Sequence, residues 1–208
     1  MIDPADATLA AYQTGAEQYL KASARPGPKM IAYLDRLAGM VGNGHVLEIG
    51  SGPGWEADHL ESRGVRVTRT DATPAFVDLL RAAGHDARRL DVRFDPLGGP
   101  YQAVLANAVL LHLSRPQFED VVRRAGQAVV VGGVLGFTLK EGDAGAWSQD
   151  KLAVPRYFTY WREPAVREVL VRAGWSVVSV DHVAGRKEAW LYVLARTARV
   201  AAAANIRP

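Results

Sequence analysis

VLEIGSGPG (residues 46–54) joins a short apolar run to a turn with glycine at every second position. The apolar residues predict a buried strand, and a helix pattern begins immediately after the turn. Glycine tolerates positive φ angles and lets the backbone lie close to a ligand. Because the helix that follows presents unpaired N–H groups to the turn, this stretch predicts a site for an anion or a carboxylate in an α/β protein.

An acidic residue follows the next predicted strand. VRVTRT (65–70) ends at Asp71, about twenty residues after the glycine turn. An acid at this position lies beside the turn and can accept hydrogen bonds from both hydroxyls of a ribose. The alternative is that Asp71 caps the helix led by Pro74, but Thr73 is expected to fill that position. We therefore expect Asp71 to bind a ribose.

Two further positions bear on which nucleotide is bound. Asp91 ends a short strand predicted near residues 87–90, where its carboxylate can accept from an adenine amino group or serve as a turn residue. A nicotinamide-binding turn would have its third glycine at position 55, where this chain has Trp55. The spacing therefore argues against a nicotinamide oxidoreductase.

The rest of the chain continues the alternation of strands and helices, which predicts an α/β sheet. Two helices are expected before it, near 5–22 and 29–39, and a polar, aromatic insertion interrupts it at 141–162. The last two strands are separated by a short loop, which predicts an antiparallel pair at the sheet edge. The tail AAAANIRP (201–208) is expected to fray. The later elements are predicted at 101–106 (strand), 114–128 (helix), 134–140 (strand), 164–174 (helix), 176–182 and 189–196 (strands).

Composition limits the classes of function. The 208 residues are 49% hydrophobic and 23% charged, as in an ordinary globular domain. No cysteine is present, which excludes a thiolate nucleophile and cysteine-ligated zinc, and we expect no metal site. The net charge of +3 comes from scattered arginines, so nucleic acid is not the expected substrate. No apolar run long enough for a membrane span and no secretory pattern is visible, so we expect a cytoplasmic protein.

Taken together, VLEIGSGPG, Asp71, Asp91 and YQAVLANAVLLHL (101–113) resemble the class I S-adenosylmethionine (SAM) methyltransferases. The resemblance extends over about residues 45–196. It implies a Rossmann-like, seven-stranded, mostly parallel sheet of order 3-2-1-4-5-7-6 with an antiparallel seventh strand, helices on both faces and N-terminal cap helices. It also implies one domain, 1–208, made of a helical cap, a cofactor-binding half and an acceptor-side part (1–40, 41–140 and 141–208).

The resemblance further implies a set of cofactor contacts. Tyr12 and Tyr19, seven residues apart on the first predicted helix, either pack in the core or close over the cofactor, and both interpretations stay open. The other implied contacts surround the methionine end (Glu48, Gly50, Ser51, Gly52, Gly54), the ribose (Asp71, Ala72), the adenine (Asp91, Val92) and the sulfonium (Asn107, Ala108).

Methyl transfer is an in-line displacement, and a base helps when the acceptor is a hydroxyl or a protonated amine. His112 follows the fourth strand and is the candidate base, although it could equally be a packing residue. Glu141 could orient an acceptor or lie in a solvated turn. Tyr157, in an aromatic segment with Trp147, could form the acceptor wall or pack beneath the N-terminal helices.

The sequence therefore predicts a SAM-dependent enzyme that methylates an O or N atom of a small molecule, as a monomer or homodimer. Methylation at cytosine carbon 5 is excluded because no cysteine is available, and Asn107-Ala108-Val109-Leu110 lacks the Pro-Pro-aromatic signature of DNA amino methylation. The alternatives are a non-catalytic SAM-binding protein and a nucleic-acid-directed methyltransferase.

Overall fold

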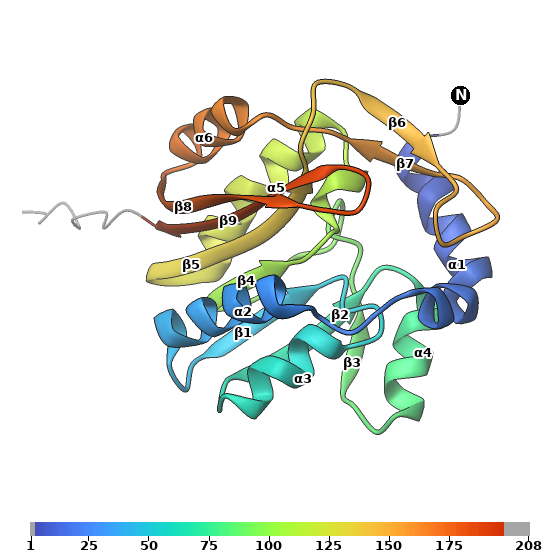
Figure 1. The fold of residues 1–208 in the computed structure, drawn as a ribbon. Helices are drawn as coiled ribbons and strands as arrows, with labels where there is room; N and C mark the ends of the chain where they lie inside the picture. The colour runs from blue at the N-terminus through green and yellow to red at the C-terminus, as the bar shows by residue number, and fades with distance from the viewer. Residues whose placement is uncertain (1–2, 198–208) are drawn as a thin grey trace, which may run out of the picture.

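The computed structural model describes residues 3–197. Seven strands form one sheet of order β3-β2-β1-β4-β5-β9-β8 (Figure 1). The first five strands of this sheet are parallel, and β9 runs antiparallel to both β5 and β8. Since β8 and β9 are the sixth and seventh strands of this sheet along the chain, the expected order 3-2-1-4-5-7-6 is confirmed. The strands are β1 His45–Ile49, β2 Arg66–Asp71, β3 Ala87–Arg89, β4 Tyr101–Ala106, β5 Val129–Lys140, β8 Trp175–Ala184 and β9 Ala189–Thr197.

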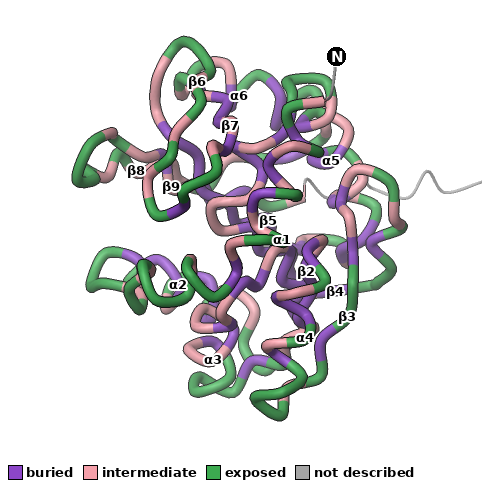
Figure 2. The backbone as a smooth tube through the Cα atoms, turned by 90° about the vertical axis from the view of Figure 1, so that its right-hand side faces the viewer, coloured by how far each residue is buried: buried purple, intermediate pink, exposed green. Residues whose placement is uncertain are grey.

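Alternate residues of the central strands pack against helices on opposite faces of the sheet, as the two-residue period of a strand requires. Val46 and Leu105 belong to a cluster built with α2, whereas Leu47 and Val104 belong to one built with α5 and α6. Figure 2 shows the resulting concentration of buried residues in the central strands. The helices are α1 Pro4–Ala22, α2 Pro28–Val41, α3 Trp55–Ser62, α4 Pro74–Ala82, the 3-10 turn η1 Leu110–His112, α5 Arg115–Ala128 and α6 Glu163–Arg172.

Two local differences from the sequence-based expectation have physical causes. The fifth strand begins at Val129 instead of residue 134, because Gly132 takes a φ of +76° and a bulge opposite β4 lets the strand continue through the Gly132-Gly133 pair. The insertion at 141–162 is not irregular, since β6 Gly145–Ser148 and β7 Arg156–Thr159 pair as an antiparallel hairpin. The tail 201–208 lies outside the described residues.

Helix α1 lies across the carboxyl edge of the parallel strands and positions the site. It packs against α4, η1 and β7, and Figure 1 shows it beside the β6–β7 hairpin. The Tyr157 N–H donates to the Thr8 hydroxyl at 2.9 Å, which ties the hairpin to the helix. The N-terminal helix and the insertion thus form one roof over the strand ends. Within residues 3–197, none of the helices has the length and apolar character that crossing a bilayer requires.

Candidate active site

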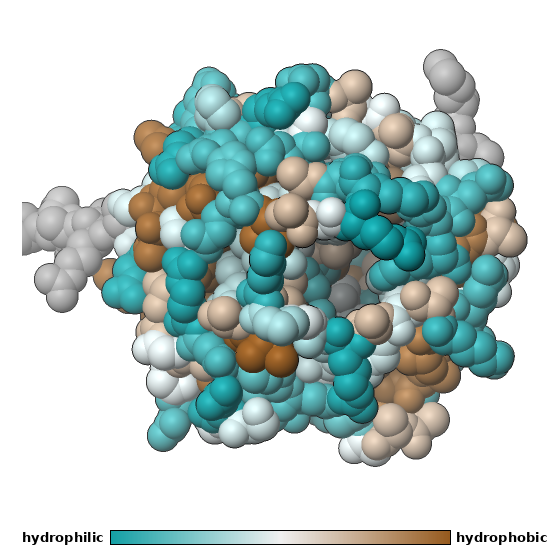
Figure 3. All heavy atoms as spheres, viewed as in Figure 1, coloured by the Kyte–Doolittle hydropathy of each residue, from teal (hydrophilic) through white to brown (hydrophobic). Residues whose placement is uncertain are grey.

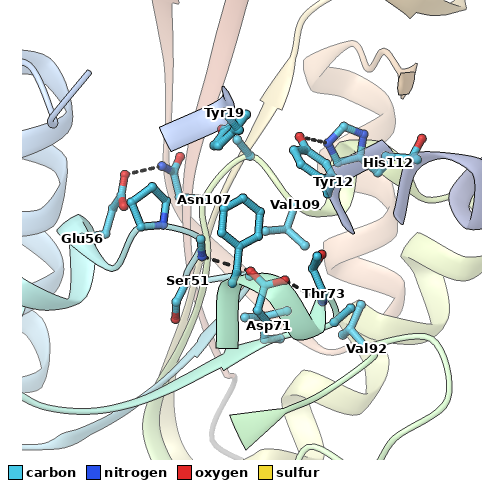
Figure 4. A pocket seen from close by; sticks show the side chains of 18 of the residues that line it. Tyr12, Tyr19, Ser51, Glu56, Asp71, Thr73, Val92, Asn107, Val109 and His112 are labelled. Carbon is cyan, nitrogen blue, oxygen red and sulfur yellow. Dashed lines mark hydrogen bonds between the residues drawn. The ribbon is translucent and has the colours of Figure 1, made fainter. Parts of the chain in front are cut away.

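A cavity of about 300 Å³ lies between this roof and the carboxyl ends of β1, β2 and β4. Figure 3 shows the surface hollowed near the middle of one face, and Figure 4 shows side chains from α1, the glycine turn, β2 and η1 converging on the cavity. In open α/β sheets, ligands bind at this edge, and the volume is that of a small-molecule pocket.

The glycine turn forms the floor of the cavity, and the need for glycine differs among its three glycine positions. Gly50 has a φ of +69°, and a Cβ there would lie 2.3 Å from Val109 Cγ2. Gly54 has a φ of +85° and would meet Leu80 Cδ2 at 2.7 Å. A Cβ on Gly52 would meet nothing within 4 Å, although its φ is +48°. The turn is therefore packed tightly at both ends and open to a ligand in its middle.

Asp71 is held beside this turn by two backbone donors. Its Oδ2 accepts from the Gly52 N–H at 3.0 Å and its Oδ1 from the Thr73 N–H at 2.8 Å. Burial raises the pKa of Asp71, and these hydrogen bonds counteract the rise. Each carboxylate oxygen accepts about two hydrogen bonds, so each retains one acceptor position for a hydroxyl of a ligand.

The expectation that Thr73 occupies the N-cap position of α4 is confirmed, but the Thr73 side chain makes no capping hydrogen bond. Pro74 has no N–H to offer, the Ala75 N–H donates to Gln13 Oε1 of α1 at 3.1 Å, and the Phe76 N–H donates to the Thr73 carbonyl. Because α1 docks here, Gln13 accepts the hydrogen bond of the Ala75 N–H, which the Thr73 hydroxyl could otherwise accept.

Two glutamates, the buried Glu48 and the half-buried Glu56, lie together at one end of the site. Glu48 lies beneath the cavity, where burial, together with the charge of Glu56, raises its pKa to about 8. Its Oε2 has no hydrogen-bond partner among the described residues. Glu56, at the start of α3, lines the cavity and accepts from Asn107 Nδ2 at 2.8 Å, and burial raises its pKa as well. Such an arrangement suits a positively charged ligand group.

Thr138 fixes the turn after β4 and was not predicted. Its hydroxyl donates to Asn107 Oδ1 at 2.7 Å and accepts from the Ala108 N–H at 2.8 Å. Ala108 has a φ of +54°, which is uncommon for a residue with a side chain. The sequence signal for Thr138 is its hydroxyl within the apolar stretch VLGFTLK (134–140) of the neighbouring strand.

Asp91 lines the cavity and forms hydrogen bonds with Arg93. The carboxylate accepts from Arg93 Nε at 3.0 Å and Nη2 at 2.7 Å, while Arg93 Nη1 donates to Asp6 of α1 at 2.7 Å. Burial opposes ionisation of Asp91, but the hydrogen bonds and charge of Arg93 together outweigh it and lower the pKa of Asp91. Asp91 thus also anchors the roof.

His112 belongs to a hydrogen-bonded chain. Its Nδ1 lies 2.7 Å from the Tyr157 carbonyl, which only accepts, so Nδ1 carries the proton. Its Nε2, 3.1 Å from the Tyr12 hydroxyl, then accepts from that hydroxyl (Figure 4). The Tyr12 oxygen in turn accepts from Arg156 Nη1 at 2.9 Å. Burial lowers the pKa of His112 to about 3, so the imidazole is neutral.

The structure brings most of the predicted site residues to one cavity. Glu48 and Gly54 lie next to the lining rather than in it, and the Glu141 carboxylate instead contacts His182 Nδ1 at 2.9 Å. The Tyr157 ring packs on Trp147 with 5.3 Å between centroids, and only its backbone takes part in the chain above. The predicted residues in the lining are Tyr12, Tyr19, Gly50, Ser51, Gly52, Asp71, Ala72, Asp91, Val92, Asn107, Ala108 and His112; those not predicted include Glu56, Phe76, Lys151, Trp190 and Tyr192.

These residues fit SAM. The open face of Gly52 leaves room for a ligand against the backbone, and Asp71 retains acceptor positions beside it. The unpartnered Glu48 oxygen and the Glu56 carboxylate are suited to the ammonium and sulfonium charges of SAM. The site therefore offers both the backbone clearance and the electrostatic complement that this cofactor needs.

Comparisons with known proteins agree with this geometry. Residues 47–137 match the family described as "Methyltransferase domain". No curated protein sequence matches the chain. Among solved structures, the complex of DhpI with S-adenosylhomocysteine (SAH) is 25% identical in sequence to this chain. The match has a TM-score of 0.68 and covers 95% of this chain and 98% of that one. The Synechocystis magnesium protoporphyrin IX methyltransferase ChlM with bound SAM is 13% identical, with a TM-score of 0.75 over 95% and 99%.

A third similar structure is the Burkholderia thailandensis 1,6-didemethyltoxoflavin-N1-methyltransferase, at 18% identity and a TM-score of 0.69 over 93% of this chain and 88% of that one. The family match over residues 47–137, the strand order and the glycine turn bonded to Asp71 together show that the chain carries a SAM-dependent methyltransferase domain.

Proposed function

We propose that this methyltransferase transfers a methyl group from SAM to an O or N atom of a small molecule. One observation carries the proposal: the Gly52–Asp71 hydrogen bond sets the ribose-binding acid against the glycine turn in the cavity that also holds Asn107 and His112. SAM supplies a methyl group activated by its sulfonium. The chain's own residues must therefore bind, align the acceptor and exclude water.

Each part of the cavity has a proposed task. The glycine turn and Asp71 hold the cofactor's amino-acid tail and ribose, while Glu48 and Glu56 face its positive charges. Tyr12 and Tyr19, from α1, lie over the site with their rings 5.3 Å apart and exclude water. Nε2 of the neutral His112 can accept a hydrogen bond, either from the Tyr12 hydroxyl or from a proton of the bound methyl acceptor.

A small acceptor is favoured over a nucleic acid by the roof. Helix α1 and the β6–β7 hairpin cover the strand ends, and the cavity beneath them is of metabolite size. DhpI and the 1,6-didemethyltoxoflavin-N1-methyltransferase have similar folds, and the structure of the latter contains the small molecule 1,6-didemethyltoxoflavin.

The test is release of S-adenosylhomocysteine (SAH) from SAM by the purified chain. Acceptor panels of alcohols, phenols, amines and acids are compared with RNA and DNA oligonucleotides. We expect turnover with at least one small molecule and none with the oligonucleotides. Turnover with oligonucleotides alone would contradict the proposal, and tight SAM binding without turnover on any acceptor would favour a non-catalytic SAM-binding protein.

A further inference from the structure

Lys151 stands at the rim of the cavity in a strained backbone conformation. Its φ is +69°, and among the residues that the structure describes, only Ala108 shares a positive φ without being glycine. Both residues line the cavity. Left-handed conformations cost free energy for residues with side chains, and they gather at functional sites. The ammonium lies 5.0 Å from the Tyr19 ring centroid and 3.4 Å from the Ser23 hydroxyl, with no carboxylate partner among residues 3–197.

Arg156 places a second positive charge in the roof. The residue is 3% exposed, and its guanidinium donates to the Tyr12 hydroxyl and to the Asp150 carbonyl. Its Nε has no hydrogen-bond partner in the described part of the chain. The guanidinium carbon lies 5.2 Å from the Tyr12 ring centroid and 5.8 Å from that of Tyr19. Buried charges are normally paired, but the hydrogen-bond partners of this guanidinium are a hydroxyl and a carbonyl, and no carboxylate within residues 3–197 forms an ion pair with it.

Arg156 lies toward the end of the cavity away from Glu56, whereas Lys151 lies close enough to Glu56 for each charge to shift the pKa of the other. Glu56 and Asn107 lie on the opposite side of the labelled residues from Tyr12 and His112 in Figure 4, and Arg156 bonds to Tyr12. The cofactor carries two positive groups, which suit the acids, and a single carboxylate. That carboxylate can neutralise only one of the two cations, Lys151 and Arg156. One positive charge is left for the acceptor.

We propose that the acceptor is an organic acid, bound as its anion near Lys151 and Arg156 and methylated on an anionic oxygen. This inference rests on the proposed methyltransferase function. The acceptor oxygen uses a lone pair to form the new O–CH₃ bond, the CH₃–S bond breaks, and its electron pair stays on sulfur. A carboxylate becomes a neutral ester, a phosphonate loses one negative charge, and in neither case does a proton have to leave.

The state of His112 agrees with such an acceptor. His112 Nε2 already accepts a hydrogen bond from the Tyr12 hydroxyl, and His112 Nδ1–H already donates one to the Tyr157 carbonyl. A hydroxyl or ammonium acceptor would require a free base, whereas an oxyanion does not. In this arrangement Arg156, Tyr12 and His112 form a fixed polar wall against which the acid lies.

The test measures binding and turnover in parallel. Protein saturated with SAH is titrated calorimetrically with phenylacetate and phenylphosphonate, and with the uncharged phenylacetamide. SAH release from SAM is followed with the same compounds, with wider panels of carboxylic and phosphonic acids, and with alcohols, phenols and amines. We expect acids to bind about tenfold more tightly than the amide, and an acid to be the methylated class. The two acid panels distinguish a carboxylate from a phosphorus oxyanion.

Variants of Lys151 show whether its charge binds the acid group of the methyl acceptor or the carboxylate of the cofactor. Lys151→Gln should weaken acid binding about tenfold and leave amide binding unchanged, Lys151→Arg should restore it, and the exposed Lys29→Gln serves as the matched control. Turnover confined to alcohols, phenols or amines would overturn the inference, as would equal binding of acids and amide. Lys151→Gln weakening SAH binding alone would also overturn it. Failure to bind SAH at all would instead refute the methyltransferase function.

Discussion

Replacing Glu48 by Gln should stabilise the unliganded protein above neutral pH. The pKa of Glu48 rises from an ordinary 4.5 to about 8 because the side chain is buried near the Glu56 carboxylate. Between these two values the unfolded chain is ionised while the folded chain keeps its proton, so the wild type loses stability as pH rises from 4.5 to 8. Each pH unit in this range corresponds to about 1.4 kcal/mol, and the amide still buries a polar atom, so we expect a net gain of about 1–3 kcal/mol at pH 8.

The assay is urea unfolding followed by tryptophan fluorescence between pH 4.5 and 8.5, with exposed Glu17→Gln as the control. The stability of the wild type should fall relative to that of Glu48→Gln as pH rises, so that the variant is the less stable protein near pH 4.5 and the more stable one at pH 8. SAH affinity should fall in Glu48→Gln, because an amide, unlike the Glu48 carboxyl, cannot ionise when the positive charge of the ligand binds beside it. Parallel curves across the whole range would refute the burial of an unpaired Glu48 carboxyl.

Three further predictions concern the turn, its support and the histidine. Gly50→Ala should abolish SAH binding, because the Cβ would lie 2.3 Å from Val109 Cγ2; calorimetry on Gly50→Ala/Val109→Ala should show only partial recovery, since the φ of +69° remains unfavourable, and full recovery would contradict this. Thr138→Val should destabilise the fold by about 1–3 kcal/mol in urea unfolding, because Asn107 and the Ala108 N–H lose their partner; an unchanged midpoint would contradict the assignment. The pKa of His112 falls from 6.5 to about 3, so stability present above pH 6.5 is lost as pH decreases toward 3. His112→Gln should remove this loss, which is about 1.4 kcal/mol for each pH unit, and an unaltered acid slope would count against the buried neutral imidazole.

The parts of the fold that the sequence predicts are local and periodic. The apolar run 45–49, the glycine spacing and the position of Asp71 are all contained in short stretches, and the strand order follows from the family resemblance that they carry. The register of β1 against β2 then brings residues 51 and 71 together, since Ile49 pairs with Thr70.

The parts that sequence analysis missed depend on contacts between distant segments. Tyr12 and Arg156 are 144 positions apart, and their hydrogen bond exists only because α1 lies on the β6–β7 hairpin. The missing capping bond from the Thr73 side chain likewise involves a distant segment, because Gln13 Oε1 of α1 accepts from the Ala75 N–H. Thr138 acts on Asn107 across neighbouring strands, which a reading along the chain does not pair.

Asp71 and the glycine turn are proposed to bind an adenosyl group. The decisive test of this binding is calorimetric titration of SAH into Asp71→Asn, with exposed Asp78→Asn as the control. Asp71 is proposed to accept two hydroxyl hydrogen bonds, so its substitution should weaken SAH binding about tenfold to a hundredfold, while the control binds like the wild type. Equal affinity in all three proteins would contradict the assignment of this cavity to the cofactor.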